Sequence, residues 1–358
     1  MILTKLDRFI IKKFLGTFVF MLFLLMAISI VFDLSEKLNE FIANGAPWDE
    51  IIFVYYSNFF VNYGTQFSYL LNFISVIWFT SKMAGNTEIV PILSSGVGFN
   101  RFLRPYFISA TILVIATILV YNFVLPQSNA ARIEFEEVYY RDHNTKTDVR
   151  LQLANNDILY FRRYDGVKKE IKDFSLERIV GTRMEYSLNA KKAIGDSLSN
   201  NWHFENISIR RNGEFNDDLF YAKELDTVLE FGVNDLVFRP NIIEAMDNKE
   251  LDQFIKEQEQ TGSSKISYYL IKKHERWAAP FAIFILTLIG VSVSSKKSRG
   301  GLGVNIAIGL GVCVLYIFSM QMTTVAALNV GFTPILAVWL PNIIFSIIAY
   351  FLYLKAPK

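Results

Sequence analysis

The chain has 358 residues, of which 52% are hydrophobic, 15% aromatic and 20% charged, with a net charge of +2. Soluble domains rarely combine so much apolar mass with so many charges, so this composition excludes an ordinary soluble protein and predicts that charged and apolar residues are segregated. The single cysteine, Cys313, excludes an intrachain disulfide.

Six apolar stretches are each long enough for a membrane-spanning helix, which needs about 20 apolar residues. None has a charge in its middle, where a charged side chain is costly. The basic start before the first stretch is followed by no small-residue cleavage site, so we expect a retained span rather than a signal peptide. The six stretches are Phe14–Phe32, Ile51–Phe79, Tyr106–Leu125, Trp277–Val293, Leu302–Ala327 and Ile335–Leu354.

Basic residues gather in alternate loops, and this asymmetry predicts the orientation. Loop 33–50 carries five acids and only Lys37, and loop 328–334 has no charge. We therefore expect both termini in the cytoplasm and the polar block 127–262 outside it. The bases on the expected cytoplasmic side are Lys5, Arg8, Lys12, Lys13, Lys82, Arg101, Arg104, Lys296, Lys297, Arg299, Lys355 and Lys358.

The polar block 127–262 has a strand-like pattern, because apolar and polar residues alternate in short runs separated by turn sequences. Within Trp202–Arg210 the apolar positions change faces, which predicts a bulge or register change near Asn206. Such strands predict an antiparallel sandwich or roll. The runs are Asp157–Tyr164, Met184–Leu188, Trp202–Arg210 and Val228–Phe238, and a short amphipathic helix with Leu251, Phe254 and Ile255 follows them.

The predicted fold is therefore an α-helical membrane protein with six transmembrane helices and an inserted extracytoplasmic all-β, jellyroll-like domain. Residues 1–126 hold the first three helices and a cytoplasmic helix near 86–98. Residues 127–262 form the β domain, and residues 263–358 hold the last three helices.

The sequence contains no recognisable catalytic set. Its three histidines lie far apart, and His274-Glu275 lacks the second histidine of a zinc-protease motif. The glycine-rich stretch 298–303 lacks the Gly-Lys-Ser/Thr ending of a phosphate loop. No acidic residue lies within the spans, which disfavours an ion-coupled transporter. We expect no enzyme activity, no metal and no cofactor, and any work must draw its energy from a partner or from an ion gradient, of which the ion gradient is disfavoured.

The second span carries amides at helical spacing, since Asn58, Asn62 and Gln66 recur every four residues. Tyr69 and Asn72 continue roughly the same face. Amides cannot face lipid cheaply, so this face forms either hydrogen bonds between helices or the wall of a wet cavity. If it is a cavity wall, Asn62, Gln66 and Tyr69 are the candidate substrate-binding residues.

A second feature is the cytoplasmic segment 82–104, which is too long for a minimal turn. Asn86 or Thr87 could cap a short helix that Gly96 would stop, although Pro91 stands near its start. Such a helix is a docking element. We expect Glu88 and the apolar face formed by Ile89, Ile92 and Leu93 to insert into a groove of a partner.

These features, in this order, resemble the LptF/LptG permeases, which carry lipopolysaccharide out of the inner membrane of Gram-negative bacteria. The resemblance covers almost the whole chain. Its landmarks are Leu6-Asp7-Arg8-Phe9-Ile10, the segment from Glu88-Ile89-Val90 to Ser94-Ser95-Gly96, Arg104-Pro105, Pro126-Gln127, Arg276, Ala279-Pro280, Gly290, Tyr316, Pro334 and Trp339-Leu340-Pro341-Asn342.

The resemblance implies an ATP-driven exporter that extracts lipopolysaccharide from the outer leaflet of the inner membrane. Its implied partners are a second homologous permease, a cytoplasmic ATPase dimer bound through coupling helices, and a periplasmic jellyroll bridge protein that receives the lipid, with no nucleic acid. Glu88, Ile89, Ile92, Leu93 and Gly96 would form the coupling element. The alternative is a non-transporting receptor or anchor whose β domain binds a periplasmic partner.

The sequence departs from the family at the outer end of span one, where members often carry several basic residues that meet lipid phosphates. Only Lys37 is present there, beside Glu36. Lys37 is therefore either a phosphate contact or a lysine that reaches the headgroups while pairing with Asp33, four residues away.

Overall fold

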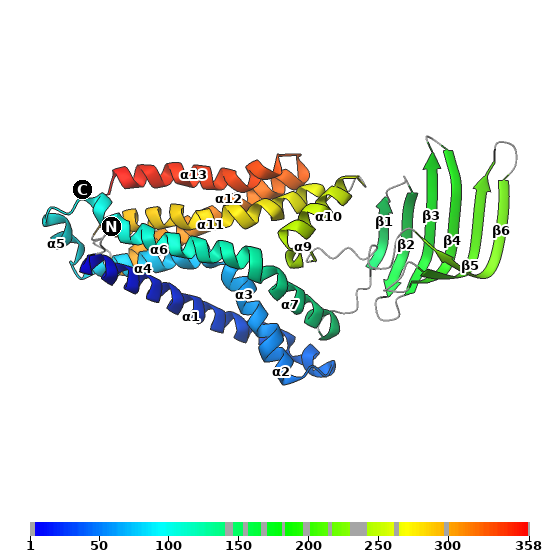
Figure 1. Ribbon diagram of the computed structural model, residues 1–358, viewed down its shortest axis with the longest axis horizontal. Helices are drawn as coiled ribbons and strands as arrows, with labels where there is room; N and C mark the ends of the chain where they lie inside the picture. Colours follow the sequence, from blue (N-terminus) through cyan, green and yellow to red (C-terminus); the bar gives the residue numbers. More distant parts are fainter. Residues whose placement is uncertain are drawn as a thin grey trace. The chain divides into compact units, whose positions relative to one another are not determined.

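The computed structural model describes residues 4–139, 146–152, 157–165, 170–180, 183–195, 201–213, 217–229, 242–260, 265–296 and 301–356. The chain divides into two compact units (Figure 1). We call them the helical unit and the sheet unit. The helical unit comprises Met1–Arg132, Glu244–Leu251 and Ser267–Lys358, and the sheet unit comprises Ile133–Ile243 and Asp252–Ile266.

The long helices follow from the apolar stretches of the sequence. Figure 1 shows that both chain ends and α5 lie at the same end of the helical unit. The first part of the chain forms α1 (Lys5–Ala43), α2 (Trp48–Glu50), η1 (Ile51–Tyr56), α3 (Ser57–Gln66), α4 (Ser68–Gly85), α5 (Ile89–Ser94), α6 (Phe99–Leu119), η2 (Val120–Val124) and α7 (Leu125–Tyr139). The last part forms α9 (Ile242–Ala245), α10 (Asn248–Gln260), α11 (Ile266–Ser294), α12 (Gly301–Asn329) and α13 (Pro334–Leu354).

Five helical segments in the described chain are long and apolar enough to cross a membrane. They correspond to five of the six predicted spans. The second predicted span differs, because it is divided into η1, α3 and α4, with a break at Phe67. Polar residues such as Asn62 and Gln66 make its first half less apolar than the other spans. The five segments are Lys5–Ala43, Phe99–Glu136, Ile266–Ser294, Gly303–Asn329 and Pro334–Leu354.

Close approach and buried hydrogen bonds hold the helices together, as in other membrane bundles. A Cβ atom at Gly290 of α11 would lie 2.8 Å from Val76 of α4, so only glycine fits there. Polar side chains in the bundle pair across helices. These pairs are Asn72 with Thr287, Asn305 with Ser81, and Asn342 with Tyr316, at 2.9, 3.0 and 2.8 Å.

The sheet unit contains one antiparallel sheet in which the six described strands pair in chain order. The inserted all-β domain is as predicted, but the described strands form one meander rather than two separate sheets. The predicted strand Val228–Phe238 lies almost entirely outside the described residues. The strands are β1 (Lys146–Gln152), β2 (Asp157–Asp165), β3 (Glu170–Val180), β4 (Arg183–Gly195), β5 (Asn201–Asn212) and β6 (Asp217–Val228).

The buried face of this sheet changes along one row of residues that face one another on neighbouring strands, and we call this row the crease. Three residues of the row, on alternate strands, have left-handed backbones with φ of +53° or +54°. Asp and Asn tolerate this conformation better than other side chains that carry a Cβ. Buried positions change faces at the row, yet the pairing register is constant across it. The row is Asp148, Arg162, Asp173, Lys191, Asn206 and Lys223.

The crease lets one sheet enclose a core from two sides. Trp202 and Phe204 lie on one side of the row and Phe174 on the other, yet the Phe174 ring centroid is 6.0 Å from Trp202 and 5.0 Å from Phe204. All three side chains are buried. The irregularity predicted near Asn206 is therefore present, but it is a left-handed residue and not a change of register.

Candidate functional site

The predicted docking helix exists as α5, but its apolar face points into the bundle. Ile89 is 1% exposed, and Ile92 and Leu93 pack against the core that contains Phe99 and Phe102. In this structure these side chains attach α5 to its own chain, and the expectation that this face inserts into a partner stays a prediction. The outward face includes Val90, which is 59% exposed.

The turns on either side of α5 are also defined. Glu88 precedes the helix without a side-chain cap, and it accepts a hydrogen bond of 3.0 Å from the Asn86 amide. Neither Asn86 nor Thr87 is the cap, contrary to the prediction. Pro91 fits within the first turn, where no backbone N–H is needed. Gly96 ends the segment with φ +86°, as predicted for a glycine stop.

An ion pair with a buried carboxylate joins the first residues of α1 to α6. Both carboxylate oxygens of Asp7 accept hydrogen bonds from the Arg101 guanidinium, each 2.6 Å long. The Asp7 side chain is 4% exposed, and its carboxylate also accepts from Thr4 in a capping box. The Thr-x-x-Asp spacing signals this cap in the sequence, but nothing local signals the arginine.

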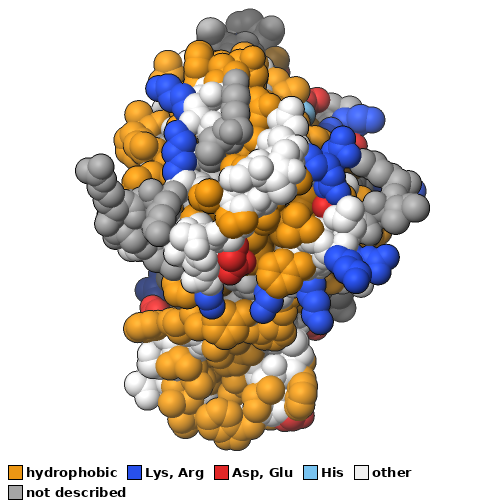
Figure 2. Space-filling view, turned by 90° about the vertical axis from the view of Figure 1, so that its left-hand side faces the viewer, with side chains coloured by type: hydrophobic (Ala, Val, Ile, Leu, Met, Phe, Trp, Pro, Cys, Tyr) orange, Lys and Arg blue, Asp and Glu red, His pale blue; other side chains and the backbone are white. Residues whose placement is uncertain are grey.

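The same end of the helical unit is rich in basic side chains. Figure 2 shows more Lys and Arg than Asp and Glu on this face, among hydrophobic side chains. The exposed bases at this end come from segments far apart in sequence. They include Lys5, Lys12, Lys13, Lys82, Arg104, Lys296 and Lys355.

At the far end of α1, Lys37 is engaged by its own chain. Its ammonium lies 2.7 Å from an Asp33 carboxylate oxygen and donates to the hydroxyl of Tyr55. Tyr55 in turn donates to Asp33 over 3.0 Å, and Tyr55 is fully buried. The Lys37 side chain is only 13% exposed. This arrangement favours the role of anchoring α1 to η1 over that of a free cation for lipid phosphate.

The amides of the second predicted span do not lie on one continuous helix face, because the helix is broken at Phe67. Asn62 is buried, Gln66 is exposed, and Tyr69 is half-buried against Tyr316, with ring centroids 5.5 Å apart. No hydrogen bond links the three candidate residues within the described chain. Asn72, further along, is fully buried and bonded across helices to Thr287.

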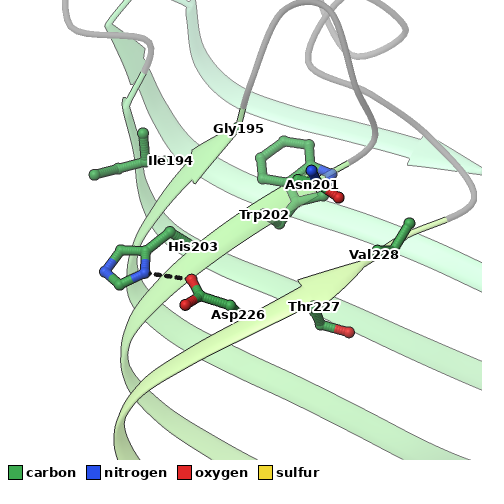
Figure 3. Close-up of a pocket in the computed structure, with 8 residues that line it drawn as sticks. All are labelled: Ile194, Gly195, Asn201, Trp202, His203, Asp226, Thr227 and Val228. Carbon is green, nitrogen blue, oxygen red and sulfur yellow. Dashed lines mark hydrogen bonds and ion pairs between the residues drawn. The ribbon is translucent and has the colours of Figure 1, made fainter.

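The sheet unit has an open hollow of about 500 Å³ at the ends of β4, β5 and β6 (Figure 3). A cross-strand pair borders it, in which His203 Nδ1 and Asp226 Oδ1 are 2.6 Å apart. This hydrogen bond raises the pKa of His203. Trp202, beside the pair, is 1% exposed, so its ring cannot stack on a ligand. Among the residues described, no group of His, Cys, Asp and Glu is arranged to hold a metal.

The long apolar helices and the inserted antiparallel sheet agree with one family. Residues 8–355 match the family of the lipopolysaccharide export system permease LptF/LptG. The chain belongs to this family. A comparison with curated proteins finds no match. The chain is therefore an inner-membrane protein of a permease family and not a catalytic enzyme.

Membership of the LptF/LptG family fits the resemblance drawn from the sequence. The sequence did not reveal three contacts: Asp7 with Arg101, Lys37 with Tyr55, and Arg276 of α11 with Met246 and with Asn248 at the start of α10. Arg276 stood out only as a landmark, because the partners of a buried side chain are set by tertiary packing.

Proposed function

We propose that this chain is a permease subunit of an ATP-driven exporter that extracts lipopolysaccharide from the outer leaflet of the inner membrane. Its partners would be a second homologous permease, a cytoplasmic ATPase dimer and a periplasmic jellyroll bridge protein. The observation that carries the proposal is the family match over residues 8–355, and the short helix α5, on which Val90 is exposed, supports it. The sequence itself has no phosphate loop, so ATP hydrolysis falls to the partner.

The proposed orientation puts both chain ends and α5 in the cytoplasm and the sheet unit in the periplasm. Basic residues favour the cytoplasmic side of a membrane protein, and the end that carries α5 shows more Lys and Arg than Asp and Glu (Figure 2). This orientation would present α5 to the ATPase.

The proposed ATPase contact is the outward face of α5, with Glu88 and Val90, and the turn at Gly96. Ile89, Ile92 and Leu93 would contribute indirectly, by fixing the helix to the bundle. Val90→Asp would then disrupt ATPase binding without unfolding the chain. Ile89→Asp, as the matched change on the buried face, would reduce the stability of the chain itself.

The proposed lipid exit is the sheet unit. Among the described strands β6 pairs only with β5, and Leu219, Phe220 and Tyr221 on β6 are all more than half exposed. An edge strand can pair with a strand of another protein. Photo-crosslinkers placed along β6 are expected to capture a β-rich partner or lipid during transport, whereas capture of neither would contradict this part of the proposal.

Copurification tests the whole proposal. The tagged chain, extracted in mild detergent, should bring down an ATPase and a second permease, and lipopolysaccharide should stimulate ATP hydrolysis in nanodiscs. Recovery of a periplasmic partner alone, without an ATPase, would favour the non-transporting receptor instead.

A further inference from the structure

The segment Glu244–Leu251 joins the helical unit, although the residues before and after it in sequence belong to the sheet unit. It contains the end of α9 and the start of α10. The return path from the sheet is therefore fixed to the bundle before α11 begins. Figure 1 shows α9 and the first turn of α10 beside α7 and α11.

Arg276 of α11 makes the central contacts with this segment. Its guanidinium donates 2.8 Å to the Met246 carbonyl and 3.0 Å to the Asn248 side-chain oxygen. Asn248 then donates 2.5 Å to Asn122 on η2. Arg276 is 6% exposed, so these hydrogen bonds form largely out of water.

Glu244 receives a second set of contacts. Asn129 of α7 donates 3.1 Å to the Glu244 backbone carbonyl, and Lys272 of α11 lies 3.7 Å from its carboxylate. Arg132 of α7 lies 4.0 Å from the same carboxylate. Side chains from α7, η2 and α11 thus all converge on residues 244–248.

We propose that Arg276 is a positioning residue that clamps segment 244–248 between α11 and η2, so that movement of these helices is passed along the chain to the sheet unit. The proposal rests on the proposed function, because it assigns the clamp to lipid transfer. The planar guanidinium suits this role, since one side chain can bond a carbonyl and an amide in two fixed directions. The π-helical turn at η2 also fits, because such turns are frequent at functional sites.

Hydrogen exchange measured by mass spectrometry tests the clamp without transport. In nanodiscs, Arg276→Gln should speed exchange in peptides covering 244–251 by about tenfold or more, because hydrogen bonds from a charged group are lost. Exchange within β2 to β5 should not change. Lys296→Gln, which removes an exposed positive charge just beyond the other end of α11, is the control and should leave exchange at wild-type rates. Unchanged exchange in Arg276→Gln would overturn the clamp.

Lipid transfer per ATP hydrolysed tests what the clamp does. Asn248→Ala is the milder variant, because Arg276 keeps its hydrogen bond to the Met246 carbonyl. This variant should therefore fold even if Arg276→Gln does not. Both are expected to keep ATPase copurification and to lose severalfold in lipid released per ATP, with Arg276→Lys in between. Faster hydrogen exchange in residues 244–251 with an unchanged amount of lipid released per ATP would overturn the proposal that helix movement is passed to the sheet unit. If the wild type itself moves no lipopolysaccharide, the proposed function fails, while the exchange result still decides the clamp.

Discussion

The two units use polar side chains in opposite ways. In the helical unit, carboxylates and amides are buried and held by specific partners, as in Asp7 with Arg101 and Asn72 with Thr287. In the sheet unit the core is apolar and aromatic, as around Phe174, and ion pairs such as Arg210 with Asp217 and Arg162 with Asp173 are exposed, although Asp157 in its pair with Arg178 is buried. The surroundings explain the difference, since lipid cannot satisfy a polar group and water can.

This comparison implies that equal chemical changes have unequal consequences. A buried charge that loses its partner is left without solvation, whereas an exposed one returns to water. Pairs with a buried carboxylate, such as Asp7 with Arg101 in the helical unit, should therefore be sensitive to substitution, and exposed pairs, such as Arg210 with Asp217 on the sheet, should not.

The largest effect is expected for Asp7→Asn, which removes the buried carboxylate that binds Arg101 in two places. We expect the thermal midpoint of the purified chain to fall by roughly 5 °C or more. Asp217→Asn is the matched control, because Asp217 pairs with Arg210 on the sheet with both side chains more than one-third exposed. If the thermal midpoints of the two variants, measured in detergent, fall by the same amount, buried and exposed pairs do not differ as proposed.

A second prediction concerns Lys37, which lies near the end of α1 and pairs with Asp33 and Tyr55. Lys37→Met should destabilise the chain by about 2 kcal/mol, because Asp33 and Tyr55 lose a charged partner. The double change Asp33→Asn with Lys37→Met should recover most of that loss. Chemical denaturation of the three variants measures the coupling.

The same double variant separates the two interpretations of Lys37. An anchoring role predicts that stimulation of ATP hydrolysis by lipopolysaccharide recovers along with stability. A phosphate contact predicts that stability recovers while stimulation stays low.

A smaller effect is expected at the crease of the sheet, where Asn206 has φ +53°. Asn206→Val should cost about 1–2 kcal/mol, since a left-handed backbone is strained for branched side chains. Asn206→Gly should be neutral or slightly stabilising. Ser208→Val, two residues along the same strand, is the control, because valine suits an ordinary strand position. Equal stability of the Asn206→Val and Ser208→Val variants would show that the crease imposes no strain.

The sequence predicted the elements better than their contacts. Apolar length is a local property, so it located the membrane helices, and alternation located β2 and β5. The sequence did not predict the break at Phe67. It also did not predict that Ile89 of α5 is buried, because the residues that cover Ile89 come from other helices. Asp7 and Arg101 lie 94 residues apart, so no local pattern could join them.

The smallest effect is expected for His203 on the sheet surface. Its hydrogen bond to Asp226 raises its pKa above the usual value of 6.5, and Glu224 and Glu205 act in the same direction. A raised pKa means that the folded chain holds the proton more tightly than the unfolded one. The stabilisation is therefore complete below about pH 6.5 and is lost as the pH rises through the higher pKa of the folded state.

NMR titration of the His203 ring, assigned by comparison with His203→Gln, should give a midpoint above 6.5. In Asp226→Asn the midpoint should return toward that ordinary value, because the first and largest cause of the shift is removed. Because the pair is exposed, the accompanying change in thermal midpoint between mildly acidic and mildly alkaline pH should be smaller than that of Asp7→Asn. A wild-type midpoint at or below that of Asp226→Asn would show that the pair does not hold the proton. A change in thermal midpoint with pH as large as that caused by Asp7→Asn would contradict the expectation that exposed pairs on the sheet contribute little to stability.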